Sequence, residues 1–208
     1  MERITLPARE LSGKVSLNET LRKRASCRNF DKKSIFKTQL SNILWSGQGV
    51  LTTQFNMRRT TPSAGSTFPI ELLVAVRKKG IEEVPPGIYH YLPKEHALEP
   101  VSDRDITGDI PEVCFNQEFI KKASASLLIA SDDERTTRMY ADRGERYVYM
   151  EAGAAMQNIA LEAVELGLGT VIVGAFDDSG LEEVFQLEKL RPLAIMPIGY
   201  PRDKAFYA

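Results

Sequence analysis

The order of apolar and polar residues along the chain predicts a set of buried strands. Residues 70–76 are almost continuously apolar and rich in β-branched side chains, the pattern of a strand that is covered on both faces. Residues 126–130 form another largely apolar run and predict a second buried strand. Two further apolar runs flank the turn-like sequence P-K-E-H at 93–96, which predicts a hairpin. The strands expected from this pattern are 70–76, 87–91, 97–101, 126–130, 170–173 and 193–198.

Helical periodicity and capping signals lie between these runs. Capping boxes at 16–19 and 179–182 predict the starts of two short helices, and the first should reach about Arg24. Residues 38–46 have the spacing of a third helix, which Gly47 and Gly49 are expected to end. Its predicted apolar face consists of Leu40, Ile43 and Leu44.

The longest helical pattern runs from about residue 146 to 166 and ends at Gly167. One stripe of this helix is apolar but made largely of small residues, so another helix can approach it closely. The stripe consists of Val148, Ala152, Ala155, Ile159 and Ala163. Packing within one protomer and a seam between two subunits both explain it, and the pattern leaves the two open.

Strands separated by helices and one hairpin predict a single α+β domain over residues 1–208, with a mixed central sheet flanked by helices. Lys and Arg (27) nearly cancel Asp and Glu (28), which argues against nucleic acid as a partner. The N-terminus has no apolar targeting segment and no run approaches the length of a membrane span, so we expect a cytoplasmic protein with no membrane partner.

Cysteine and histidine offer little chemistry. Cys27 and Cys114 are far apart in the sequence and form no CxxC pair, so we interpret them as reduced thiols. His90 and His96 are the only histidines and both fall in the predicted hairpin. The sequence therefore offers few histidines for a metal site or for a Ser-His-Asp triad, and we expect no metal.

The first candidate site is the segment that follows the first helix. In an extended chain, Arg24, Ser26 and Arg28 point the same way. Two guanidinium groups and a hydroxyl would then converge on one spot, which suits a phosphate dianion. The alternative for this segment is a solvated basic stretch.

Two other segments offer small residues to a flat ligand. The turn-rich stretch 58–69 contains T-T-P-S-A-G-S at 60–66, where backbone can approach closely and Ser63 can donate a hydrogen bond. Gly174 and Ala175 follow the predicted strand 170–173 and could present backbone N–H groups to a ring. A plain surface loop and a tight strand-to-helix turn are the respective alternatives.

These segments resemble the nitroreductase family in order, from about residue 15 to 199. R-A-S-C-R-N-F-D at 24–31 is similar to the family's opening Arg-x-Ser-x-(Arg/Lys)-x-Phe-Asp, and P-S-A-G at 62–65 is similar to the loop that a second subunit lays across the isoalloxazine ring. G-A-F-D at 174–177 matches the turn whose amides lie against flavin N5, and the helix ending L-G-L-G at 166–169 resembles the family's dimer helix and its exit.

The resemblance implies an intertwined homodimer with FMN at the subunit interface. Arg24, Ser26 and Arg28 would hold its phosphate and ribityl chain, and an amide side chain before a buried strand would lie near its pyrimidine edge. The cofactor residues implied are Arg24, Ala25, Ser26, Arg28, Pro62, Ser63, Ala64, Gly65, Asn116, Gln117, Gly174 and Ala175, with Arg202 or Lys204 as the basic residue after the last strand.

Finer features resemble the SagB-type dehydrogenases, which oxidise azoline rings in ribosomal peptides. The shared segments are R-T-T-P-S-A-G at 59–65, P-G-I-Y-H-Y at 86–91 and D-R-G-E-R-Y at 142–147. Those enzymes carry a catalytic Lys-Tyr pair just before the Arg-Gly segment, where this chain has Met139 and Tyr140. Since Met cannot act as a base, azoline oxidation is in question, and Tyr140 stands as the one candidate catalytic side chain.

The function implied is an FMN-dependent oxidoreductase that uses NADH or NADPH to reduce a small electrophilic acceptor, such as a nitroaromatic or a quinone, by ping-pong hydride transfer. Four alternatives stay open. They are an azoline-type dehydrogenase for peptide maturation, a non-catalytic FMN-binding or storage protein, an enzyme that makes or degrades flavin, and a subunit of a hetero-oligomeric maturation complex.

Overall fold

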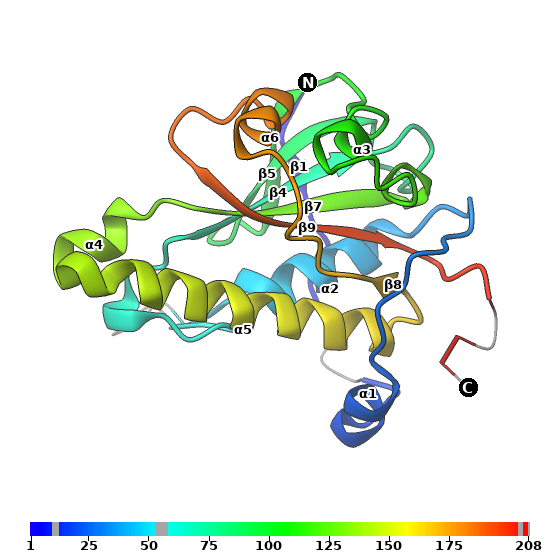
Figure 1. The fold of residues 1–208 in the computed structure, drawn as a ribbon. Helices are drawn as coiled ribbons and strands as arrows, with labels where there is room; N and C mark the ends of the chain where they lie inside the picture. The colour runs from blue at the N-terminus through cyan, green and yellow to red at the C-terminus, as the bar shows by residue number, and fades with distance from the viewer. Residues whose placement is uncertain (10–12, 53–57, 204–205, 208) are drawn as a thin grey trace.

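The computed structural model describes residues 1–9, 13–52, 58–203 and 206–207. Within them, the central element is a seven-stranded sheet in the order β1-β6-β5-β4-β7-β9-β8 (Figure 1). Its strands are β1 (Ile4–Thr5), β4 (Ile70–Val76), β5 (Gly87–Leu92), β6 (Ala97–Ser102), β7 (Ala125–Ser131), β8 (Gly169–Thr170) and β9 (Arg191–Gly199). A separate two-stranded ribbon joins β2 (Val50–Thr52) and β3 (Arg58–Arg59).

All pairings between named strands of the described chain are antiparallel, including β4 with both β5 and β7. Parallel contact is limited there to isolated bridges, one of which joins Ser26 to Thr170. The predicted α+β class is confirmed, but the described sheet is antiparallel where a mixed sheet was predicted, because the chain returns between neighbouring strands in opposite directions. The hairpin and the buried strands 70–76, 126–130 and 193–198 are also confirmed, each to within about two residues.

Helices cover both faces of the sheet. The described helices are α1 (Leu17–Lys23), α2 (Lys37–Gln48), α3 (Ile110–Val113), α4 (Glu134–Tyr140), α5 (Gly144–Glu165) and α6 (Asp178–Phe185), with 3₁₀ turns at Ala64–Ser66, Ile120–Lys122 and Ala141–Arg143. In Figure 1, α2 and α5 lie below the sheet, and α3 and α6 lie above it. None of the described helices is both long and apolar enough to cross a membrane.

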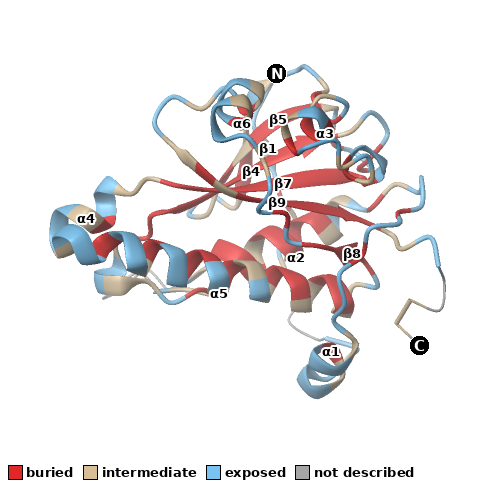
Figure 2. Ribbon diagram, in the orientation of Figure 1, coloured by how far each residue is buried: buried red, intermediate tan, exposed pale blue. Residues whose placement is uncertain are grey.

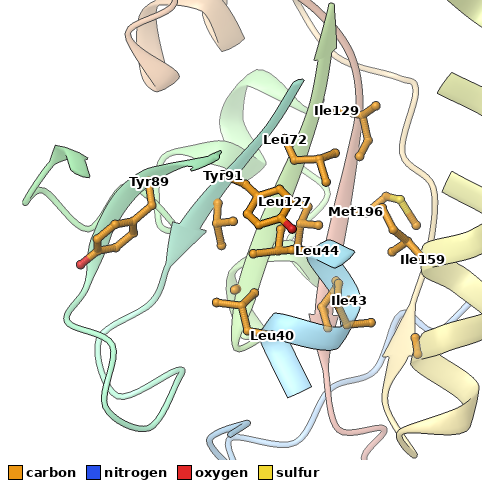
Figure 3. Packing of buried hydrophobic residues seen from close by; sticks show 14 of the residues in the cluster. Leu40, Ile43, Leu44, Leu72, Tyr89, Tyr91, Leu127, Ile129, Ile159 and Met196 are labelled. Atoms are coloured by element: carbon orange, nitrogen blue, oxygen red, sulfur yellow. The ribbon is translucent and has the colours of Figure 1, made fainter. Parts of the chain in front are cut away.

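The alternating side chains of β4 divide the core into two parts. Leu72 and Val74 join the cluster formed with α2 and α5, whereas Leu73 and Ala75 join the cluster formed with α3 and α6. Strand β4 is therefore buried along its whole length, as its continuous apolar run predicted. Figure 3 shows the first cluster, in which Leu40, Ile43 and Leu44 of α2 pack beneath the sheet.

The predicted helix 38–46 is confirmed to within two residues, whereas the predicted cap of α6 was wrong. Helix α2 passes through Gly47, continues to Gln48 and is capped at Gly49, one of the two glycines expected to end it. A Cβ at Gly47 would lie 2.9 Å from Cδ1 of Ile159, so this glycine lets α2 approach α5 closely. The N-cap of α6 is Asp177, two residues before the predicted cap Ser179, because Oδ2 of Asp177 accepts the N–H of Gly180 at 3.0 Å.

The predicted strand 170–173 is shorter than expected. Strand β8 ends at Thr170, and only Val173 pairs with the sheet again, through an isolated bridge to Ile195. Ile172 between them is 47% exposed. The chain therefore leaves the sheet edge after Thr170, touches it once, and turns away toward α6.

The small-residue stripe of α5 packs inside the protomer. Val148, Ile159 and Ala163 are fully buried in the cluster that the sheet forms with α2, so a subunit seam along this stripe is the wrong interpretation. The other side of α5 faces solvent, as the blue side of the helix in Figure 2 shows. It exposes Arg146, Met150, Gly153 and Gln157, at spacings of four, three and four residues.

Candidate active site

The segment 24–28 is extended, as predicted, and lies beside the edge strand β8. The N–H of Cys27 donates to the carbonyl of Thr170 at 2.9 Å, and Ser26 forms a parallel bridge with Thr170. Cys27 is buried while Arg24, Ser26 and Arg28 are exposed. This close approach needs a glycine in β8, since a Cβ at Gly169 would lie 2.6 Å from Cβ and Sγ of Cys27.

Arg24 and Arg28 have no carboxylate partner among the residues that the structure describes. Arg22, two residues earlier, instead forms a bidentate pair with Glu19 at 2.7 and 3.0 Å. The backbone N–H of Arg202 donates to the carbonyl of Asn29 at 2.9 Å, which brings a third exposed guanidinium to the same segment. The positive charge of this segment is therefore available to an anionic ligand.

The predicted basic residue Lys204 lies outside the described residues. A further polar atom does lie next to the segment. Oγ1 of Thr170 is buried beside Ser26 and has no hydrogen-bond partner in the described chain. Buried hydroxyls of this kind are rarely left without a partner, so this orphaned atom is consistent with a site for a polar ligand.

The turn after Val173 is open to solvent. Gly174 and Ala175 are exposed, and a Cβ added at Gly174 would meet no atom within 4 Å. Nε2 of Gln117 donates to the carbonyl of Ala175 at 3.2 Å, and Asn116 beside it is exposed. The structure thus brings the predicted residues 116–117, which follow α3, next to the predicted residues 174–175, which lie on the stretch of chain that leads away from β8.

The other predicted residues lie elsewhere, near the start of α5. Oγ of Ser63 accepts the N–H of Phe68 at 2.8 Å, which shapes the loop 62–65. Gly65 has a φ of 58°, and a Cβ there would lie 2.7 Å from the hydroxyl of Tyr140. Tyr140 in turn packs edge-on against Tyr147, with ring centroids 5.0 Å apart.

The two groups of residues are separated within one chain. Segment 24–28 lies beside β8, which follows the end of α5, whereas loop 62–65 and Tyr140 lie beside its beginning (Figure 1). Helix α5 has 22 residues and is therefore roughly 33 Å long. The loop is nearest to Glu151, where Ser63 lies, and the helix from Glu151 to its end at Glu165 spans roughly 21 Å.

A buried carboxyl escaped the prediction from sequence. Glu151 on α5 is 4% exposed and lies near Gln48, Arg59 and Ser63. Burial raises the pKa of Glu151 to about 7, although the Ser63 hydroxyl, Arg59 and Gln48 each act to lower it. Its spacing of three and four residues from Val148 and Ala155 places it on the buried face, and this signal could have revealed it.

A second buried carboxyl, Glu71 of β4, is fully paired. Oε1 accepts from Nη1 of Arg135 at 2.5 Å, and Oε2 lies 2.7 Å from Nε2 of His90. Burial raises the pKa of Glu71, but the hydrogen bonds and charges of His90 and Arg135 outweigh it and hold that pKa below its ordinary value. Glu71 is thus a structural anion, in contrast to Glu151.

The family model named "Nitroreductase family" matches residues 21–200 of this chain. The chain belongs to the nitroreductase family. A Methanocaldococcus jannaschii protein named "Putative nitroreductase MJ1384" is 41% identical over 186 residues, which cover 89% of this chain and 91% of that protein. A solved structure from Ralstonia eutropha, titled "Crystal structure of a putative nitroreductase", superposes with a TM-score of 0.82 at 30% sequence identity. The superposition covers 97% of this chain and 90% of the Ralstonia chain.

A third relative of this nitroreductase-family chain is named for the processing of microcin B17. The Escherichia coli "Microcin B17-processing protein McbC" is 29% identical over 159 residues, or 71% of this chain. The match spans 56% of McbC, so that protein is considerably longer. The resemblance to nitroreductases and to the azoline-oxidising branch is thus confirmed at the level of family and fold.

Proposed function

We propose that this protein is an FMN-dependent oxidoreductase that takes electrons from NADH or NADPH and passes them to a small electrophilic acceptor. One observation carries the proposal. The guanidinium groups of Arg24 and Arg28, which have no carboxylate partner among the described residues, flank Ser26 on a segment that is hydrogen-bonded to β8. The chain continues from β8 to the open turn at Gly174. A ligand such as FMN, which has an anionic phosphate at one end and a flat ring at the other, would fit a site of this form.

The residues present fit FMN. The phosphate of FMN carries close to two negative charges, which Arg24, Arg28 and Arg202 can neutralise while Ser26 donates a hydrogen bond. A Cβ built at Gly174 would meet no atom within 4 Å, so a ring could approach the backbone of this turn from that side. Asn116 and Gln117 lie beside that turn, where an amide can pair with the polar edge of a flavin.

We further propose that the site is completed by a second copy of the chain. Within one protomer, loop 62–65 and Tyr140 lie toward the start of α5, whereas Arg24 and Arg28 lie beside β8, which follows its end. A partner related by a twofold axis would bring its own loop to the site of the first, and the arrangement would repeat at the second site. The exposed stripe of Arg146, Met150, Gly153 and Gln157 on α5 is a surface on which two copies could meet.

Bound FMN would supply the hydride chemistry, accepting from a reduced nicotinamide and delivering to the acceptor. The residues of the chain would position the reactants and stabilise charge. The backbone N–H groups of the 174–175 turn would hold the ring, and the amides of 116–117 would favour negative charge at its polar edge. The Tyr140 hydroxyl, which lies beside Gly65, would give a proton to a reduced product.

The test is anaerobic addition of NADH or NADPH to the purified, flavin-loaded protein. Loss of the visible flavin absorbance, and its recovery when a nitroaromatic or a quinone is added, is the expected result. A flavin that stays oxidised with both donors would contradict the reductase function. It would support the alternative of an FMN-binding or storage protein.

The relative McbC favours a second candidate, an azoline-type dehydrogenase acting on peptides. Against it, the position before Tyr140 holds Met139, whose thioether cannot act as a base. Met139 is 61% exposed and lies against Gly65, so a lysine would fit there without entering the core. Incubating wild type and Met139→Lys with an azoline-containing peptide separates the two: oxidation by wild type would support this candidate, and oxidation by the variant alone would exclude it.

A further inference from the structure

A cluster of buried polar side chains lies behind the 62–65 loop. Glu151 is 4% exposed and Gln48 is 1% exposed, and both lie close to Arg59. In the described chain, Oε1 of Glu151, Nε2 of Gln48 and Nε of Arg59 have no hydrogen-bond partner. Natural proteins leave few buried polar atoms without partners. Three of them together are costly for stability and call for a functional explanation.

The cluster is connected to the loop through Ser63. The Ser63 hydroxyl lies beside the carboxyl of Glu151 and helps to stabilise its charged form. Oγ of Ser63 also accepts the N–H of Phe68 at 2.8 Å, which fixes its position in the loop. A serine hydroxyl has a single proton to donate. Ser63 can therefore serve either the carboxyl behind it or a ligand in front of it, but not both.

Building on the proposed function, we propose that Glu151 is a positioning residue whose protonation state decides whether the Ser63 hydroxyl donates inward to the carboxyl or outward to a flavin. An ionised carboxylate can only accept, so it holds the Ser63 proton. A protonated carboxyl can instead donate to Oγ of Ser63, which releases the hydroxyl proton for the ligand. The proton that Glu151 gains or loses is exchanged with solvent, and no bond of the ligand changes.

The surroundings of Glu151 place this change near neutral pH. Burial raises its pKa to about 7, whereas Ser63, Arg59 and Gln48 act in the opposite direction. Arg59 is the one charged group among these three, and its own pKa is lowered by burial. Beyond Arg59, Glu71, Arg135 and Tyr91 face the guanidinium from β4, α4 and β5 and act on Glu151 only through it.

The sign of the effect follows from the hydrogen-bond count. Below the pKa of Glu151 the carboxyl is neutral and Ser63 donates to the ligand, so FMN should bind more tightly. Above it, the Ser63 proton is withdrawn and binding should weaken. Loss of one such hydrogen bond corresponds to about a tenfold change in dissociation constant.

The first arm of the test measures the dissociation constant of FMN across the neutral range by quenching of flavin fluorescence. In wild type, we expect FMN binding to weaken about tenfold with rising pH, after correction for the titration of the FMN phosphate. That correction is the same for every variant, because the phosphate belongs to the ligand. Glu151→Gln should bind tightly at every pH, because its amide can donate to Oγ of Ser63. Ser63→Ala should bind weakly at every pH, and the double variant should match Ser63→Ala.

Two further variants keep the test sharp. Glu165→Gln changes a carboxylate on the same helix that accepts the N–H of Lys14, and it should keep the wild-type profile. Ser63→Thr retains a hydroxyl and should keep the wild-type pH dependence. This variant gives a second test if Ser63→Ala folds poorly. A pH dependence that survives in Glu151→Gln, or additive losses in the double variant, would overturn the proposal.

The second arm does not need FMN binding. Carbon-13 NMR titration of the Glu151 carboxyl in the full-length protein should show a higher pKa in Ser63→Ala than in wild type, because a stabilising donor is lost. An unchanged pKa would overturn the link between the two residues. If that pKa moves but wild type binds no FMN, the proposed function fails together with the ligand half of this proposal, while the Glu151–Ser63 link stands.

Discussion

Removing the guanidinium of Arg28 tests the phosphate end of the site most selectively. Arg28 is exposed and has no carboxylate partner in the described chain, so Arg28→Ala should leave the stability of the fold unchanged. A hydrogen bond to a charged group contributes about 1.5–3 kcal/mol, and the exposure of this side chain favours the low end. FMN should therefore bind roughly tenfold more weakly.

The assay compares FMN with riboflavin, which has the same ring but lacks the phosphate. Titration by quenching of flavin fluorescence should show the tenfold loss for FMN and no loss for riboflavin, and added salt should reduce the difference. Arg22→Ala is the matched control, because Arg22 is equally charged but committed to Glu19. Equal losses for both flavins, or an equal loss in the control, would refute a phosphate contact at Arg28.

Four shorter predictions concern the turn, a cap, the core and pH. Gly174→Val should leave folding intact, since a Cβ there meets nothing within 4 Å, but should abolish FMN uptake; retained uptake would place the ring elsewhere. Asp177→Ala should lower the free energy of unfolding by about 1 kcal/mol in urea titrations, while Ser179→Ala should change it by less than about 0.5 kcal/mol, and the reverse order would contradict the observed cap. Ile159→Ala should cost about 2–5 kcal/mol in the same assay, because this side chain is fully buried; a loss below about 1 kcal/mol would show that α5 does not pack as described. Burial lowers the pKa of His96 below its ordinary 6.5. As pH falls, the unfolded chain therefore takes up a proton at His96 before the folded chain does, and the free energy of unfolding should decrease as pH drops through and below 6.5. His96→Asn should flatten this part of the plot of stability against pH, and an unflattened plot would assign the loss to other groups.

The sequence was sufficient for the elements whose side chains follow a clear period. The continuous apolar run of β4 and the hairpin signals of β5 and β6 located the sheet to within about two residues. The alternation at Arg24, Ser26 and Arg28 likewise predicted an extended segment with three exposed side chains, which the structure has. In both cases local geometry alone determines which side a residue faces.

The features that the sequence did not reveal depend on contacts between distant segments. Gly47 reads as a helix terminator, yet it lies inside α2 because Ile159 of α5 occupies the space of a side chain. The small-residue stripe of α5 has the same pattern whether it meets a sheet or a second subunit, and only the fold shows that it meets the sheet. Glu151 was missed because a carboxylate on a helix is ordinarily solvated, and burial by the 59–63 segment is a tertiary effect.

Two copies of the chain are proposed to hold FMN between them, and one measurement tests this directly. The purified protein is weighed under native conditions, then denatured, and the released chromophore is identified by its mass. We expect an assembly of two 23.3 kDa chains that releases FMN. A colourless protein that remains a single chain and takes up no added FMN would contradict the account.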